Sequence, residues 1–172
     1  MEDAQSIASR FAITKVLVVD DEHYMRKVAR AMLTSLGVRT IYEAPHGVAG
    51  LDAIRSYAPD VVILDWEMPG LDGPGFVRMV RSPDTFPFPD VPIIMLTGHG
   101  ERSRVEEALG AGVHEFLLKP VSSKALRDRL VSVLVHPRPS IRRGNYYGPV
   151  PRKIAAVKAE ADRAIANIVY LK

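Results

Sequence analysis

Short apolar runs that alternate with segments of helical periodicity constrain this chain more than any other feature. The runs lie at residues 15–19, 40–44, 61–64, 91–96 and 115–118. Apolar residues recur at helical spacing in the intervening segments, which are residues 22–36, 47–57, 76–81, 102–111 and 122–136. Apolar runs without polar alternation are typical of strands that are buried on both faces. The alternation predicts an α/β fold with a doubly wound, five-stranded parallel sheet.

Polar side chains stand where four of these five runs end. Asp20 and Asp21 follow the first run, Asp65 follows the third, Thr97 follows the fourth and Lys119 follows the fifth. Because ligands of parallel α/β sheets bind beyond the carboxyl ends of the strands, we expect these five side chains to converge at one edge.

Three carboxylates in one place repel one another unless a cation joins them. Mg²⁺ accepts one or two carboxylates together with water and phosphate oxygens. Phosphoryl transfer needs positioning and neutralisation of the phosphoryl oxygens, for which the ammonium of Lys119 and the hydroxyl of Thr97 are suited. One carboxylate of the cluster could then act as the nucleophile. These residue types therefore indicate Mg²⁺-dependent phosphoryl transfer.

Five motifs occur along the chain in a fixed order. They are Asp20-Asp21, Asp65, Met68-Pro69-Gly70-x-Asp72-Gly73, Thr97-Gly98 and Lys119-Pro120. As a set, over residues 14–136, they resemble the bacterial two-component response-regulator receiver domain, of the single-domain type found in chemotaxis regulators. The resemblance implies the flavodoxin-like receiver fold and a phosphorylation-dependent signalling switch rather than a classical enzyme.

The resemblance also implies roles for individual residues. Asp65 corresponds to the phospho-acceptor and Asp21 to the direct Mg²⁺ ligand. Asp20 would hold a water bound to the metal, and the backbone carbonyl of Glu67 would complete the protein ligands. Lys119 would pair with the phosphoryl group. Such a protein catalyses only its own phosphorylation and dephosphorylation.

A switch pair is implied as well. Thr97 and Phe116 resemble the family's hydroxyl and ring, of which the hydroxyl moves to the phosphate and the ring turns inward. The Lys119–Pro120 bond is expected to be cis. Two positions, Glu67 and His99, sit where the family varies and tunes the lifetime of the phosphate. Glu67 could pair with Lys119 or with a bound partner, or screen the site from water, whereas His99 could assist a water. Both could equally be solvated loop side chains.

Taken singly, these residues have simpler interpretations. An isolated Asp20 or Asp21 is more often a helix N-cap than a metal ligand. Asp65 alone could be a strand-end turn residue, and Phe116 on a short strand is most often part of the core. The functional interpretation rests on the joint occurrence of the motifs.

The composition changes after His136. Residues 1–135 contain 15 Lys and Arg against 18 Asp and Glu, whereas residues 136–172 contain eight basic residues against two acidic ones. Residues 137–151 are predicted to form a basic Pro/Gly linker. Residues 152–171 are predicted to form an amphipathic helix with one narrow apolar stripe. That helix could fold back on the receiver domain, contact a partner or form a homodimer.

Composition excludes several classes of site. The chain contains no cysteine, which removes disulfides, thiol nucleophiles and thiolate metal sites. No apolar stretch suits a signal peptide or a membrane span, so a cytoplasmic protein is expected. We expect a histidine kinase or phosphotransfer protein to supply the phosphate and a protein target to receive the signal.

Alternative functions are a transcription regulator with a minimal basic tail, an aspartate-based phosphohydrolase and a flavodoxin-like cofactor binder. The dispersed charges of the tail disfavour nucleic-acid binding. The absence of an Asp-x-Asp nucleophile motif on the first strand disfavours the phosphohydrolase, and the acidic strand ends disfavour a flavin phosphate.

Overall fold

A parallel sheet of five strands forms the centre of the molecule. The computed structural model describes residues 3–98 and 102–151. Its helices are α1 (Ala4–Ile13), α2 (His23–Ser35), α3 (Gly47–Tyr57), α4 (Gly73–Val80), α5 (Arg102–Ala111) and α6 (Ser123–Val135). Its strands are β1 (Lys15–Val19), β2 (Thr40–Ala44), β3 (Val61–Asp65), β4 (Ile93–Thr97), β5 (Glu115–Leu118), β6 (Ser140–Arg143) and β7 (Tyr146–Pro149). The sheet has the strand order β2-β1-β3-β4-β5 with all neighbours parallel, which confirms the predicted fold class.

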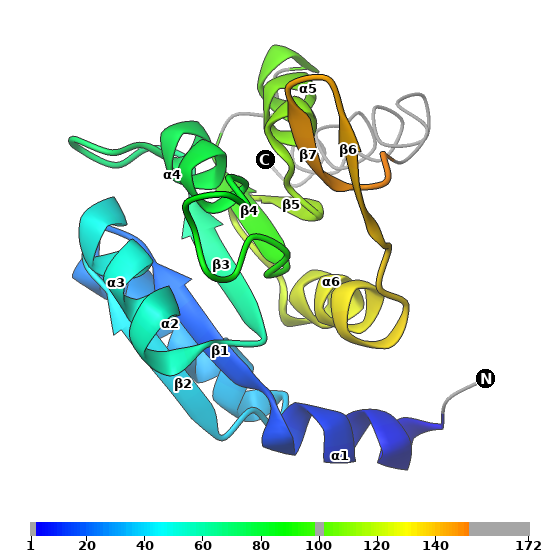
Figure 1. Cartoon of the computed structure of the whole chain (residues 1–172). Helices are drawn as coiled ribbons and strands as arrows, with labels where there is room; N and C mark the ends of the chain where they lie inside the picture. The colour runs from blue at the N-terminus through cyan, green and yellow to red at the C-terminus, as the bar shows by residue number, and fades with distance from the viewer. Residues whose placement is uncertain (1–2, 99–101, 152–172) are drawn as a thin grey trace.

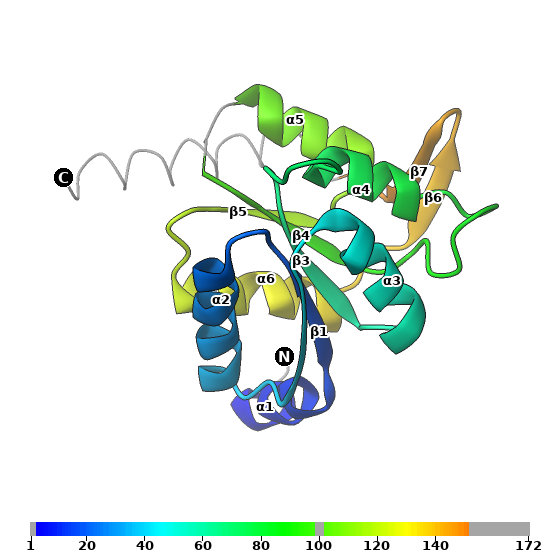
Figure 2. The same ribbon diagram turned by 90° about the vertical axis from the view of Figure 1, so that its left-hand side faces the viewer.

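Helices cover both faces of this sheet (Figures 1 and 2). One face carries α3, α4 and α5, whose Leu51, Phe76 and Val105 belong to one apolar cluster. The other face carries α1, α2 and α6, with Phe11, Leu33 and Leu130 in a second cluster. Successive side chains of β1 enter the two clusters alternately, as the strand period requires. Burial on both faces explains why the strands read as continuous apolar runs.

The first helix, α1, lies before the start of the receiver domain that the sequence predicts at residue 14. The side chain of Asp3 caps it by accepting a hydrogen bond from the backbone N–H of Ser6 at 2.8 Å. Phe11 is 1% exposed and packs into the second cluster. The Arg10 guanidinium donates to the carbonyl of Leu134 on α6 at 3.1 Å. This helix is therefore part of the packed domain.

Residues 140–149 form an antiparallel hairpin, where the sequence predicts part of a linker. Arg143 pairs with Tyr146 across a two-residue turn, and Gly144 there adopts a φ of 56°. Such turns favour glycine, so the composition that suggests a linker also suits a hairpin. The hairpin lies against α5 (Figure 1). Tyr147 fastens it by donating a 2.6 Å hydrogen bond to the carboxylate of Asp90.

A buried arginine next to the hairpin forms hydrogen bonds with backbone carbonyls from two different loops. Arg81 is 6% exposed and donates to the carbonyls of Gly112 at 2.9 Å and Pro89 at 2.7 Å. Its third nitrogen lies 3.0 Å from Nδ1 of His114. Burial, with the nearby charges of Arg81 and Arg138, lowers the pKa of His114 to about 3. His114 is therefore neutral at neutral pH, and its Nδ1 can accept from Arg81. Arg138 also donates to the carbonyl of His114, which joins the start of the hairpin segment to β5.

None of the helices within residues 3–98 and 102–151 is both long enough and apolar enough to cross a membrane. The helix predicted for residues 152–171, with its stripe, lies outside the described residues, as does His99.

Candidate functional site

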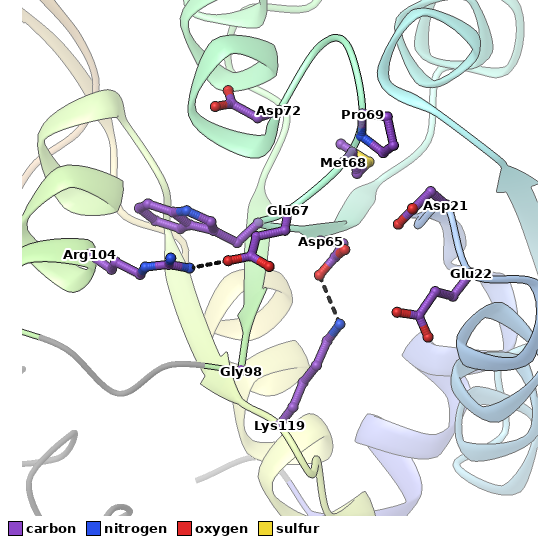
Figure 3. A pocket seen from close by; sticks show the side chains of 11 residues that line it. Asp21, Glu22, Asp65, Glu67, Met68, Pro69, Asp72, Gly98, Arg104 and Lys119 are labelled. Atoms are coloured by element: carbon purple, nitrogen blue, oxygen red, sulfur yellow. Dashed lines mark hydrogen bonds and ion pairs between the residues drawn. The ribbon is translucent and has the colours of Figure 1, made fainter.

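The carboxyl edge of the sheet gathers the polar residues that the sequence singles out. Asp65 ends β3 and Asp20 directly follows β1, which neighbours β3 in the sheet. Single oxygens of Asp20, Asp21 and Asp65 all lie within 4.8 Å of one another. Lys119, directly after β5, places its Nζ 2.8 Å from Oδ1 of Asp65 and 3.9 Å from Oδ2 of Asp20. Figure 3 shows Lys119 reaching Asp65 across the cleft from the side opposite Pro69.

Backbone hydrogen bonds fix this arrangement. Oδ1 of Asp20 accepts from the backbone N–H of Glu22 at 2.9 Å, which orients the carboxylate at the start of α2. The guanidinium of Arg26 donates to the backbone carbonyl of Asp20 at 2.7 Å. The backbone N–H of Lys119 donates to the carbonyl of Thr97 at 2.8 Å, which joins the ends of β4 and β5. The acidic residues and the lysine thus stand on a rigid scaffold.

Close packing also requires a small residue where α4 begins. A Cβ added at Gly73 would lie 2.9 Å from the backbone oxygen of Asp65 and 3.0 Å from the Cα of Trp66. The side chain of Asp72 caps α4 by accepting from the N–H of Gly75 at 2.8 Å. The Asp72-Gly73 pair therefore lets α4 start directly beside the end of β3.

Burial dominates the electrostatics of the cluster. Asp65 is 5% exposed, and burial raises its pKa to about 6 despite the hydrogen bond from Lys119, which acts in the opposite direction. Asp20 adds to the rise by repulsion. Burial likewise raises the pKa of Asp20. For Lys119 burial acts to lower the pKa, but the hydrogen bond and attraction to Asp65 outweigh it and the pKa is raised.

The donor set suits a hard divalent cation. Three carboxylates face one ammonium group here, so the described cluster carries excess negative charge when all its members are ionised. A carboxylate whose pKa is raised by burial and by like charge gains from a nearby cation. Carboxylate oxygens with an open cleft in front of them match the preference of Mg²⁺, which keeps several waters. Asp20, Asp21 and Asp65 could therefore hold it.

The expected switch residues occupy buried positions. Thr97, the last residue of β4, is 2% exposed. Phe116 on β5 is 4% exposed and belongs to the apolar cluster on the α5 face of the sheet. It stands opposite Met95 in the pairing of β4 with β5. The Lys119–Pro120 bond is cis, as expected.

Glu67 and Arg104 form an ion pair at the mouth of the cleft. From the sequence, Lys119 is one possible partner for Glu67. The structure instead places Oε1 of Glu67 2.8 Å from the guanidinium of Arg104 on α5. The guanidinium carbon of Arg104 also lies 5.6 Å from the centroid of the Trp66 ring. Both residues line the same cavity as Asp65 and Lys119. Nothing in the sequence singles out Arg104, because only the tertiary fold brings α5 to this loop.

Comparison with known proteins gives a consistent result. Residues 16–131 match the model of the response regulator receiver domain. The chemotaxis protein CheY1 of Helicobacter pylori is 39% identical over 121 residues, which cover 70% of this chain and 96% of that protein. The crystal structure of chemotaxis protein CheY4 of Vibrio cholerae is 32% identical, with a TM-score of 0.64, and the match covers 72% of this chain and all of that one.

A third similar structure carries a metal. The receiver domain of the Pseudomonas aeruginosa sensor histidine kinase PA1611, with a magnesium ion coordinated in its active-site cleft, is 28% identical with a TM-score of 0.62. The match covers 72% of this chain and 98% of that one.

Proposed function

Because this chain belongs to the response regulator receiver domain family, whose work is phosphorylation-dependent signalling in two-component systems, we propose that Asp65 is its phospho-acceptor. One observation carries the proposal. The carboxylate of Asp65 lines the cleft, 2.8 Å from the ammonium of Lys119 and beside Asp20 and Asp21. A nucleophile needs a reachable lone pair and nearby groups that stabilise the charge it receives.

In the proposed reaction an oxygen of Asp65 attacks the phosphorus of a phosphorylated histidine on a kinase or phosphotransfer protein. The new O–P bond forms as the P–N bond breaks, and the imidazole leaves with the electron pair. Asp65 reacts as the carboxylate, which predominates above its pKa of about 6. The hydrogen bond from Lys119 to Asp65 weakens as the Lys119 ammonium donates to a phosphoryl oxygen. The hydroxyl of Thr97 can donate to another phosphoryl oxygen.

Mg²⁺ would be held by Asp20, Asp21, Asp65 and the backbone carbonyl of Glu67. When bound, the ion supplies positive charge against the phosphoryl oxygens and the carboxylates. With water as the attacking group, the same residues would break the O–P bond, release inorganic phosphate and return Asp65 to the free carboxylate. The chain would catalyse only these two reactions on itself.

We propose that the output passes through protein contacts at the surface of α5, β5 and α6. Thr97 ends β4, and Phe116 lies on the adjacent strand β5, so a change at the cleft has a short path to that surface. Phosphorylation would shift a two-state equilibrium there toward the form that a protein target binds. The basic segment after His136 includes the hairpin. Because the hairpin contacts α5, it lies beside this surface.

The proposal is tested by incubation with acetyl phosphate, with and without Mg²⁺, followed by intact mass spectrometry. We expect one phosphoryl group on the natural protein, with Mg²⁺ required, and none on Asp65→Asn. Asp72→Asn is the matched control, since Asp72 lines the same cavity but serves as the cap of α4, and Asn caps helices equally well. Equal incorporation into Asp65→Asn would exclude Asp65 as the acceptor.

A further inference from the structure

An arginine of α2 contacts the main chain of the acidic site. The guanidinium of Arg26 donates to the backbone carbonyl of Asp20 at 2.7 Å. Among the described residues, Asp21 and Asp65 line the cavity at the carboxyl edge of the sheet, whereas Arg26 does not. The carbonyl of Asp20 belongs to the peptide that joins Asp20 to Asp21. Arg26 therefore contacts the one peptide group that links these two carboxylate residues.

Several contacts fix the Arg26 side chain, which is 13% exposed. Its Nε lies 3.5 Å from Oε1 of Glu43 on β2, and a terminal nitrogen lies 3.3 Å from Nδ1 of His23. Glu43 is fixed in turn, because its other carboxylate oxygen accepts from Arg30 at 2.9 Å. The planar guanidinium thus connects α2, the edge strand β2 and the Asp20 peptide, which a lysine could not do with its single nitrogen.

Asp20 is held by hydrogen bonds to both its main chain and its side chain. Its N–H donates to the carbonyl of Ala44, the last residue of β2, at 3.2 Å. Its Oδ1 accepts from the N–H of Glu22 at 2.9 Å, which orients the carboxylate toward the start of α2. Its carbonyl accepts from Arg26, and this bond fixes the plane of the peptide that leads into Asp21.

The placement of these carboxylates matters for a magnesium site. Mg²⁺ demands near-ideal octahedral geometry, at about 2.0–2.1 Å from its oxygen ligands. A rotation of the peptide between Asp20 and Asp21 would move both carboxylates relative to Asp65 on the neighbouring strand β3. Removal of an outer group that orients a metal ligand typically lowers metal affinity by about 10- to 100-fold.

We propose that Arg26 is a positioning residue of the Mg²⁺ site, which acts by fixing the peptide between Asp20 and Asp21. The inference deepens the proposed function and rests on its metal site. The charge of Arg26 alone would have the opposite effect. A cation near the carboxylates disfavours a second cation, so its removal would tighten Mg²⁺ binding. A positioning role predicts weaker binding without Arg26, so the two explanations differ in sign.

The test is the Mg²⁺ affinity of the full chain, measured without any phosphoryl donor. Trp66 is the single tryptophan of the chain and lines the cavity, so its emission can be followed during a Mg²⁺ titration. We expect Arg26→Met to raise the half-saturating Mg²⁺ concentration by about 10-fold. This is the lower end of the range for an outer group, because all the carboxylates remain.

Arg30→Met is the matched control. Arg30 also lies on α2 and pairs with the same carboxylate of Glu43, but its terminal nitrogen donates to the carbonyl of Ile41 at 3.0 Å and not to Asp20. The variant removes one arginine and one positive charge from the same group of contacts. It should leave the half-saturating Mg²⁺ concentration unchanged.

Urea unfolding followed by circular dichroism gives a second measurement, which does not depend on Trp66. At a Mg²⁺ concentration well above both half-saturating values, the gain in unfolding free energy from Mg²⁺ should be about 1.4 kcal/mol smaller in Arg26→Met, the equivalent of a 10-fold loss of affinity. Each variant is compared with itself, with and without Mg²⁺. A general loss of stability in Arg26→Met therefore cancels, and a destabilised variant still tests the proposal.

The outcomes are distinct. Unchanged or tighter Mg²⁺ binding by Arg26→Met overturns the inference and leaves the proposed function intact. An equal loss in Arg30→Met also overturns it, because the effect would then not come from the contact with Asp20. If the natural protein binds no Mg²⁺ in either measurement, the metal site of the proposed function fails and the inference fails with it. Because no phosphoryl transfer is measured, a failure of Asp65 as the phospho-acceptor would leave the inference standing.

Discussion

The raised pKa of Asp65 predicts a particular dependence of stability on pH. Burial moves this pKa from about 3.8 to about 6, so the folded protein binds the proton more tightly than the unfolded chain. Well below pH 3.8 the group is protonated in both states and contributes nothing. As the pH rises from about 4 to above 6, the unfolded state ionises first, and folding must then bury a carboxylate. Asp65 therefore destabilises the fold at neutral pH.

The magnitude follows from the shift. A difference of about two pKa units corresponds to about 3 kcal/mol, since one unit is about 1.4 kcal/mol. Asp65→Asn removes the titrating group but keeps an oxygen that can accept from Lys119. The free energy of unfolding of Asp65→Asn minus that of the natural protein should increase by up to about 3 kcal/mol between pH 4 and pH 7.5.

Urea unfolding of both proteins across this pH range, in the presence of a chelator, measures the difference directly. Asp72→Asn provides the control, because Asp72 is an exposed helix cap outside the carboxylate cluster. With Mg²⁺ added, the difference at pH 7.5 should become smaller, since a cation that binds the folded carboxylate stabilises the natural protein. A difference that stays flat or falls as the pH rises would contradict a pKa of Asp65 that burial raises.

Two further predictions concern packing. Arg81→Met should lower the free energy of unfolding by about 2–4 kcal/mol in urea titrations, because buried carbonyls lose their donor. A loss below 1 kcal/mol, or an equal loss in the exposed Arg78→Met, would contradict this role. Phe11→Ala should cost about 3–4 kcal/mol in the same assay, since the ring is 1% exposed in the core. Unchanged stability would mean that α1 does not pack on the domain.

Much of the site was accessible from the sequence, for a physical reason. Side chains at the carboxyl ends of parallel strands must meet at one edge, so a pattern of buried runs that end in Asp20, Asp65 and Thr97 already implies their neighbourhood. The structure confirms that Asp20, Asp21 and Asp65 form one cluster and that Lys119 joins it. The roles of these residues in phosphoryl transfer remain proposals, as does the switch role of Thr97 and Phe116.

Other features needed the tertiary structure. Residues 140–149 combine Pro and Gly with few apolar residues, which suits either a linker or a hairpin. Contacts from Tyr147 to Asp90 and from Arg138 to the carbonyl of His114 fasten this hairpin to the domain. These partners are distant in sequence, and no local sequence pattern predicts their contacts. The same holds for α1. Its short apolar face does not show by itself that the helix packs on the domain, and only the structure places Phe11 in the apolar cluster.

The sheet, its two faces and the acidic edge could be predicted from the sequence, because the spacing of apolar residues is a local property that repeats along the chain. Which charges meet depends on the tertiary fold. The fold pairs Glu67 with Arg104 rather than with Lys119. It also raises the pKa of Asp65 through burial and buries Arg81 next to the hairpin. Charge pairing and desolvation depend on distances between residues that lie far apart in the chain, and those distances exist only in the folded protein.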